Sequence, residues 1–221
     1  MNISRVLVGV VAASLVLSGC AGEEPAEIAA PPTITATPSP TPTPEPVKPA
    51  LDQLVISPDG LGPLVIGEAP PVADPALDVL IYEEDYCADV EGAPSAGKWI
   101  PNYEPALSEE SSEPFSVYVP EELIEQVAVD SGDILTADGV GLGSTRDEVL
   151  AAYPDAAVTV NWNTDLYVIT GDNGRLVLEV GAAGQDEYEV DEVVFVRVLN
   201  LTDKLYGWAN TDAGFAYCLN A

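Results

Sequence analysis

Proline alternates with threonine and serine over residues 37–44, and further prolines stand at positions 31 and 32. Proline lacks a backbone N–H and restricts the residue before it, so this stretch cannot form a helix or a central strand. We therefore expect residues 20–50 to be a disordered, extended linker rich in proline and threonine, which could reach roughly 90 Å at about 3.1 Å per residue. The folded part of the chain has to be built from residues 51–221.

The N-terminus has the pattern of an export signal. Arg5 precedes an apolar run over residues 6–17, which is shorter than the ~20 residues of a membrane-spanning helix. The run ends in Leu17-Ser18-Gly19-Cys20, which resembles the lipobox of a bacterial lipoprotein. The resemblance implies a signal peptide over residues 1–19 and acyl chains such as palmitate on Cys20, holding the protein to the extracytoplasmic face of the cell membrane. An ordinary secretory signal, with Cys20 incidental, and a lone transmembrane anchor are the alternatives.

The charge balance excludes several functions. The chain has 37 acidic and 7 basic residues and a formal net charge of −30, which repels nucleic acid. It has no histidine, which removes His-based catalytic triads and nearly all zinc and copper sites. The acidic surface either keeps an exported protein soluble or attracts cations and basic partners. We expect no catalytic, cofactor-binding or metal-binding residues and no cofactor.

Two cysteines remain once Cys20 carries lipid. Cys87 and Cys218 form an even pair in an oxidising compartment, so a disulfide between them is the natural expectation. The bond would close a long loop and stabilise the fold by up to ~5 kcal/mol in the entropic model. The spacing does not fix its geometry.

The second half of the folded part has the clearer secondary-structure pattern. Thr145, or Ser144 before it, is followed three residues later by an acid, as in a helix capping box, and Pro154 would end that helix. The sequence Gly171-Asp172-Asn173-Gly174 predicts a hairpin turn between strands at 166–170 and 175–180. Residues 193–199 alternate as a further strand, and the chain could close with one more, over Trp208 and residues 215–218.

The first half repeats part of this pattern. Residues 55–62 align without gaps with residues 134–141, sharing one aspartate and two glycines, and strands are expected at 54–56, 64–67, 98–100, 115–119 and 124–129. Prolines limit any helix near residues 76–80 to a short one. We expect an α+β fold of two tandem units, 51–132 and 133–221, each with a short helix and an antiparallel β meander.

One motif resembles a known family. Residues 143–149, Gly-Ser-Thr-Arg-Asp-Glu-Val, are similar to the helix opening of the small repeat in beta-lactamase inhibitory proteins and some envelope lipoproteins. That resemblance implies tandem repeats in which helices back an antiparallel sheet. Taken whole, the chain is most similar to acidic exported lipoproteins of actinobacteria with no assigned activity.

Other patterns give weaker indications of chemistry. The glycine-rich stretch 139–143 lacks the lysine of a phosphate-binding loop. The acidic clusters 83–85 and 186–192 are solvated loops or a weak calcium site, since neither has EF-hand spacing. Most aromatic residues are expected in the core, although an aromatic sheet face would bind protein; they are Trp99, Tyr103, Tyr118, Trp162, Tyr167, Tyr206 and Trp208.

We therefore expect a membrane-anchored extracytoplasmic lipoprotein that is not an enzyme and that binds a protein or another component of the cell envelope. The alternative is a small hydrolase that acts on cell-wall polymers through two carboxylates. The sequence does not identify the ligand or partner, or the oligomeric state.

Overall fold

The computed structural model describes residues 47–71, 77–88, 97–103, 113–184, 188–208 and 218. Cys20, the signal peptide and most of the expected linker lie outside these residues. Pro44–Ala221 forms one compact unit. Within the described residues, no helix is long and apolar enough to cross a membrane.

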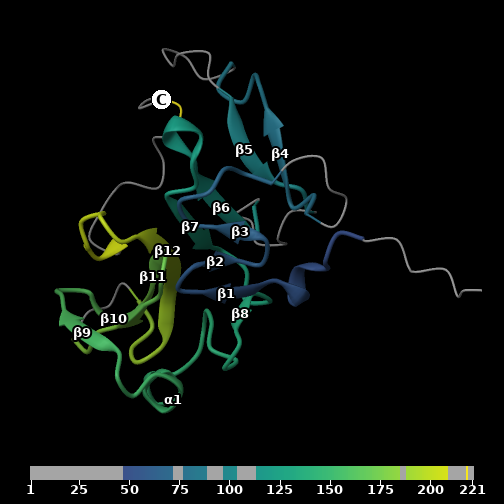
Figure 1. Cartoon of the computed structure of the whole chain (residues 1–221). Coiled ribbons are helices and arrows are strands. Elements are labelled where there is room, and N and C mark those ends of the chain that lie inside the picture. Colours follow the sequence, from purple (N-terminus) through teal and green to yellow (C-terminus); the bar gives the residue numbers. More distant parts are fainter. Residues whose placement is uncertain are drawn as a thin grey trace, which may run out of the picture. The chain divides into compact units, whose positions relative to one another are not determined.

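The central element is a six-stranded antiparallel sheet in the order β6-β7-β12-β11-β10-β9 (Figure 1). Its strands are β6 (Phe115–Tyr118), β7 (Gln126–Val129), β9 (Ala157–Val160), β10 (Thr164–Thr170), β11 (Gly174–Gly181) and β12 (Val193–Asn200). The last four of these form a meander in chain order, and β12 then pairs with β7 of the first half. The expected units 51–132 and 133–221 therefore share one sheet.

A smaller sheet has the order β3-β2-β1-β8. It consists of β1 (Val55–Ser57), β2 (Gly60–Leu61), β3 (Leu64–Val65) and β8 (Leu135–Thr136). Strands β1 and β8, which come from the two similar sequence segments, pair in parallel with Val55 opposite Leu135. A third sheet is the hairpin of β4 (Leu80–Glu83) and β5 (Lys98–Pro101), and β5 lies against β6.

The predicted hairpin turn at 171–174 is confirmed, and a tertiary contact explains both of its glycines. The N–H of Gly171 donates to the carbonyl of Gly174 at 2.9 Å, which closes the turn between β10 and β11. A Cβ on Gly171 would lie 2.6 Å from the carboxylate of Asp59, and one on Gly174 would lie 2.7 Å from the carbonyl of Pro58. The turn after β1 thus packs directly on this hairpin.

The predicted capping box is also confirmed. Helix α1 (Arg146–Ala152) has Thr145 as its N-cap, and the carboxylate of Glu148 accepts a 2.7 Å hydrogen bond from the Thr145 N–H. These bonds lower the pKa of Glu148 because they favour its ionised form. The helix is short, and of its residues only Val149 is buried, whereas Leu150 is 43% exposed.

The main core lies between one face of the six-stranded sheet, the small sheet and α1. Alternate residues of β11 and β12 point into it, as their burial and period-two pattern require; they include Leu176, Leu178, Val180, Val196 and Val198. The opposite face of the sheet carries a separate, smaller apolar cluster of Leu166, Val168, Val177 and Leu199, with Leu205 packed against it.

The structure is mostly β-sheet, which fits the expected α+β class or a mainly-β class. The prediction of a short helix near residues 76–80 is wrong for the residues that the structure describes. Residues 77–79 are not helical, and Leu80 already begins β4. Pro120 opens only a 3-10 turn, Pro120–Glu122. Strand β9 was not predicted, and Trp208 lies outside any strand; residues 215–217 lie outside the described residues.

Candidate functional site

The two cysteines expected to pair lie together. The sulfur atoms of Cys87 and Cys218 are 2.08 Å apart and their Cα atoms 5.3 Å apart, and Cys87 is fully buried. These separations are those of a disulfide. The bond would join the segment after β4 to the C-terminal end of the chain.

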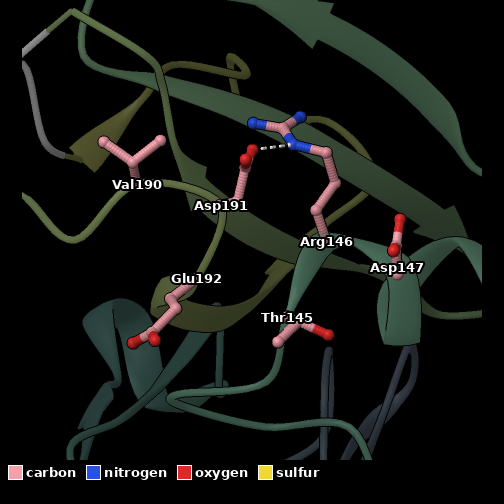
Figure 2. Close-up of a pocket in the computed structure, with 6 residues that line it drawn as sticks. All are labelled: Thr145, Arg146, Asp147, Val190, Asp191 and Glu192. Atoms are coloured by element: carbon pink, nitrogen blue, oxygen red, sulfur yellow. Dashed lines mark hydrogen bonds and ion pairs between the residues drawn. The ribbon is translucent and has the colours of Figure 1, made fainter.

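A pocket at the start of α1 is organised around Arg146 (Figure 2). Its lining residues are Thr145, Arg146, Asp147, Val190, Asp191 and Glu192. Figure 2 shows the Arg146 guanidinium facing Asp191, whereas Glu192 extends away from it. Asp191 and Glu192 come from the acidic cluster that the sequence left open as a weak calcium site.

Arg146 is held by groups from β10, β11 and the loop before β12. Its Nε donates to Asp191 at 2.6 Å, and its Nη1 donates to Asp165 at 2.7 Å and to the Tyr167 hydroxyl at 2.8 Å. Its Nη2 donates to the Gly181 carbonyl at 3.2 Å. Burial lowers the pKa of Arg146, but these hydrogen bonds outweigh that effect and raise it. Because its donors are already engaged, we interpret Arg146 as a clamp that fixes α1 to the sheet.

Within the described residues, no group of three or more acidic or cysteine side chains is arranged to hold a metal ion. In the pocket, one Asp191 oxygen is already bound to Arg146. Of the other acids in that cluster, Glu189 and Glu192 are exposed, and residues 186 and 187 lie outside the described residues.

A buried ion pair occupies the sheet face opposite the main core. The Arg197 Nη2 lies 3.0 Å from the Glu179 carboxylate, and both side chains are completely buried. Glu179 also accepts hydrogen bonds from the Thr164 hydroxyl at 3.1 Å and from the Trp208 N–H at 2.7 Å. Burial lowers the pKa of Arg197 and the charge of Glu179 opposes that shift.

The chain after β12 covers this pair. Arg197 donates to the Tyr206 carbonyl and lies over the rings of Tyr206 and Trp208, at 4.8 and 5.3 Å from their centroids. Trp208 also stacks on Phe195. Trp208 and Phe195 are therefore engaged with the protein itself, whereas Tyr206 contacts Arg197 and remains 39% exposed.

A third polar cluster lies beside β5 and β6. Lys98 forms an ion pair with Glu113 at 3.0 Å and lies over the ring of Tyr86. Asp130, which follows β7, keeps contact with solvent. Burial, and then repulsion by Glu113, raises the pKa of Asp130 to about 6, against a smaller lowering by Lys98.

Three exposed apolar residues lie together at the β9 edge of the six-stranded sheet. Every residue of β9 is exposed, with Val158 at 49% and Val160 at 77%, and Trp162 in the following turn is 77% exposed. Among the described strands, only β10 pairs with β9. Large apolar side chains on an unpaired edge strand are typical of a surface that binds another chain.

From the sequence, Trp162 was grouped with the aromatic residues that are mostly expected in the core, and the exposed edge strand β9 was not predicted. Tyr167 does lie in the core, and Trp99 and Tyr103 pack against it, but Trp162 and Tyr118 are exposed. A signal was present: residues 157–163 alternate small or polar side chains with large apolar ones, and residues 156–164 carry no charge in a chain where 20% of residues are charged. Alternation of this kind predicts a strand, and the lack of charge predicts an unprotected one.

The fold and these sites define an acidic, mostly β protein whose strand β9 has one pairing partner among the described strands. A comparison with protein-family models, with curated proteins and with solved structures found no match to this chain.

Proposed function

We propose that this protein is a lipid-anchored, non-catalytic binding module on the extracytoplasmic face of the cell membrane, and that it binds an extended segment of a protein as an added strand at β9. Cys20 would carry the acyl chains, and residues 20–50 would hold the folded part away from the membrane. The single observation that carries the binding role is the exposed, uncharged β9 edge with Val158, Val160 and Trp162.

A strand edge suits this role because its free backbone N–H and C=O groups supply hydrogen bonds, while alternate side chains supply selectivity. Trp162 is the large anchor such surfaces use, since aromatic residues contribute much of the binding free energy at interfaces. The other described sites support this reading, because Arg146 and the Arg197–Glu179 pair are already engaged within the protein.

A photo-crosslinking residue in place of Trp162, in the full chain in its own membrane, tests the binding role. We expect a discrete covalent adduct with a protein, because a strand at β9 would lie within reach of position 162. The matched control is the same residue in place of Val47, which is 78% exposed but lies outside the sheet. No adduct at position 162, or equal adducts at both positions, would contradict the proposal.

The membrane anchor has a separate test. Changing Cys20→Ala removes the thiol that lipidation needs, so we expect the protein to move from the membrane fraction to the soluble fraction. Immunoblots of both fractions measure this, and Cys87→Ala is the control for loss of a cysteine as such. A Cys20→Ala protein that stays with the membrane would show that the lipobox interpretation is wrong.

We also infer that the fold is a tandem duplication. The meander β9-β10-β11-β12 has a counterpart in β4, β5, β6 and β7, which follow one another in space as in the chain. The two series would meet where β7 pairs with β12. This arrangement resembles the tandem repeats of the beta-lactamase inhibitory family, and the parallel pair of β1 and β8 joins the two similar segments.

One observation favours the alternative function, hydrolysis of a cell-wall polymer. Asp130, with its pKa raised to about 6, lies close enough to Glu113 to feel its charge, and two such carboxylates can serve as acid and base. We rank it second because Glu113 is engaged with Lys98. Release of soluble fragments from purified cell wall by the wild type, lost in Asp130→Asn, would favour the hydrolase.

A further inference from the structure

We propose that the chain bound at β9 is a second copy of this protein, paired antiparallel about a two-fold axis at Thr159, so that two six-stranded sheets become one continuous sheet. This inference rests on the proposed binding role of β9 and names its partner.

The hydrogen-bond pattern shows which backbone groups of β9 are open. The N–H of Asn161 donates to the Thr164 carbonyl at 3.1 Å, and β9 pairs with β10 in register from Ala157 to Val160. In an antiparallel ladder, the bonded positions alternate. Residues 157, 159 and 161 therefore point their N–H and C=O groups at β10, whereas Val158 and Val160 direct theirs to the open side.

Pairing about Thr159 uses those open groups. It places Val158 of one copy opposite Val160 of the other, so that each such pair exchanges two backbone hydrogen bonds. Their side chains, which share the sheet face of Tyr167, would form one apolar row with Trp162. Trp162 would lie opposite Ala156, a small residue that leaves space for the indole.

The charge distribution allows a second copy to approach at this edge. Two molecules of net charge −30 repel each other over most of their surfaces, but residues 156–164 contain no charged residue. In the proposed register, Asp155 faces Asn163 of the other copy and Asp165 faces Tyr153. No acidic residue from 153 to 165 then stands opposite another, although neither end of the strand is free of acids.

The self-complementary register gives a sharp cross-linking test in the full chain in its membrane. Thr159→Cys would meet its own symmetry mate in a pair that is not hydrogen-bonded, where Cα atoms are about 4.5 Å apart, within the range of a disulfide. We expect mild oxidation to give a covalent dimer that reductant reverses, with none from the wild type under the same treatment.

Register is checked with two further variants carrying different tags. In the proposed register, residue 157 of one copy lies opposite residue 161 of the other. Ala157→Cys alone and Asn161→Cys alone should therefore give no dimer, because the two identical cysteines lie four positions apart along the strand. The two variants should cross-link when both chains are expressed together. A fourth variant, Val160→Lys, should weaken self-association about tenfold in the detergent-solubilised chain, because it puts a charge in place of a valine that the dimer would bury. Val47→Lys is its control.

Each result decides between the two proposals. Cross-links at Thr159→Cys and in the mixed pair support the dimer. Dimers from Ala157→Cys alone, or a monomeric chain whose photo-adduct at position 162 is a different protein, would overturn it while leaving the binding role of β9 intact. A monomeric chain without any adduct at position 162 would overturn both.

Discussion

The two outer strands of the six-stranded sheet, β6 and β9, differ in what lies beside them. On the outer side of β6 lies β5 of the separate β4–β5 sheet; on β6 itself, Val117 faces the core and is 6% exposed, whereas Tyr118 is 49% exposed. Beyond β9 no described strand follows, and Val160 is 77% exposed. Figure 1 shows the two strands at opposite ends of the sheet. The β6 edge thus has a neighbour within the chain, whereas the outer side of β9 has none among the described strands.

The largest loss of stability is expected at the buried ion pair of Glu179 and Arg197, which lies on β11 and β12, between the two edges of the sheet. Glu179→Ala leaves the charge of Arg197 buried without a partner, which should cost about 3–5 kcal/mol of unfolding free energy. Denaturant unfolding measures it. The double variant with Arg197→Met should recover most of the loss, and additive losses would show that the two residues do not act as a pair.

The next largest loss of stability is expected on the β6 side of the sheet, from the cysteine pair. One of its members, Cys87, lies in the segment after β4. Replacing both Cys87 and Cys218 by alanine should cost about 2–5 kcal/mol, because the bond closes a loop spanning 131 residues. Amide exchange should rise in β5 and β6 more than in β9. Mass spectrometry of unreduced wild type supplies the check: two free thiols at these positions would contradict the bond.

The same substitution at both edges tests the comparison most directly. Val117→Ala should cost about 2 kcal/mol of stability because it leaves a cavity in the core. Val160→Ala should cost less than about 0.5 kcal/mol in a monomeric sample, since its side chain is exposed. Equal losses, measured by denaturant unfolding below the concentration of self-association, would mean that the edges do not differ as described.

The smallest effect is a pH dependence from Asp130, next to the β6 edge. Its pKa is about 6 in the folded protein and lower when unfolded, so the stability it contributes is present below the unfolded pKa and is lost as pH rises towards 6. Because the side chain reaches solvent, we expect only about 1 kcal/mol. Asp130→Asn should remove this loss, and an unchanged pH profile would argue against it.

Local sequence predicted the elements whose cause is local. The capping box of Thr145 and Glu148, the glycine turn at 171–174 and the alternation of β12 each depend on residues close in the chain. The parallel pair of β1 and β8 and the meeting of β7 with β12 depend on residues far apart. Neither register follows from the hydrophobic pattern of the strands alone.

The candidate site shows the same division. The lack of histidine excluded histidine chemistry, the net charge argued against nucleic-acid binding, and Cys87 and Cys218 were predicted as a possible pair. The sequence did not show that Arg146 pairs with Asp165 and Asp191, because those contacts join the start of α1 to β10 and to the loop before β12.

By itself, then, the sequence determined the long strands β10, β11 and β12, the cap, the turn and the charge of this protein, since propensity and charge are properties of neighbouring residues. Only the tertiary structure decided which strands lie at the edge of the sheet. An edge is defined by the partner that a strand lacks, and that depends on how all the other strands are ordered. The uncharged stretch at 156–164 is visible in the sequence, but its exposure as β9 is not.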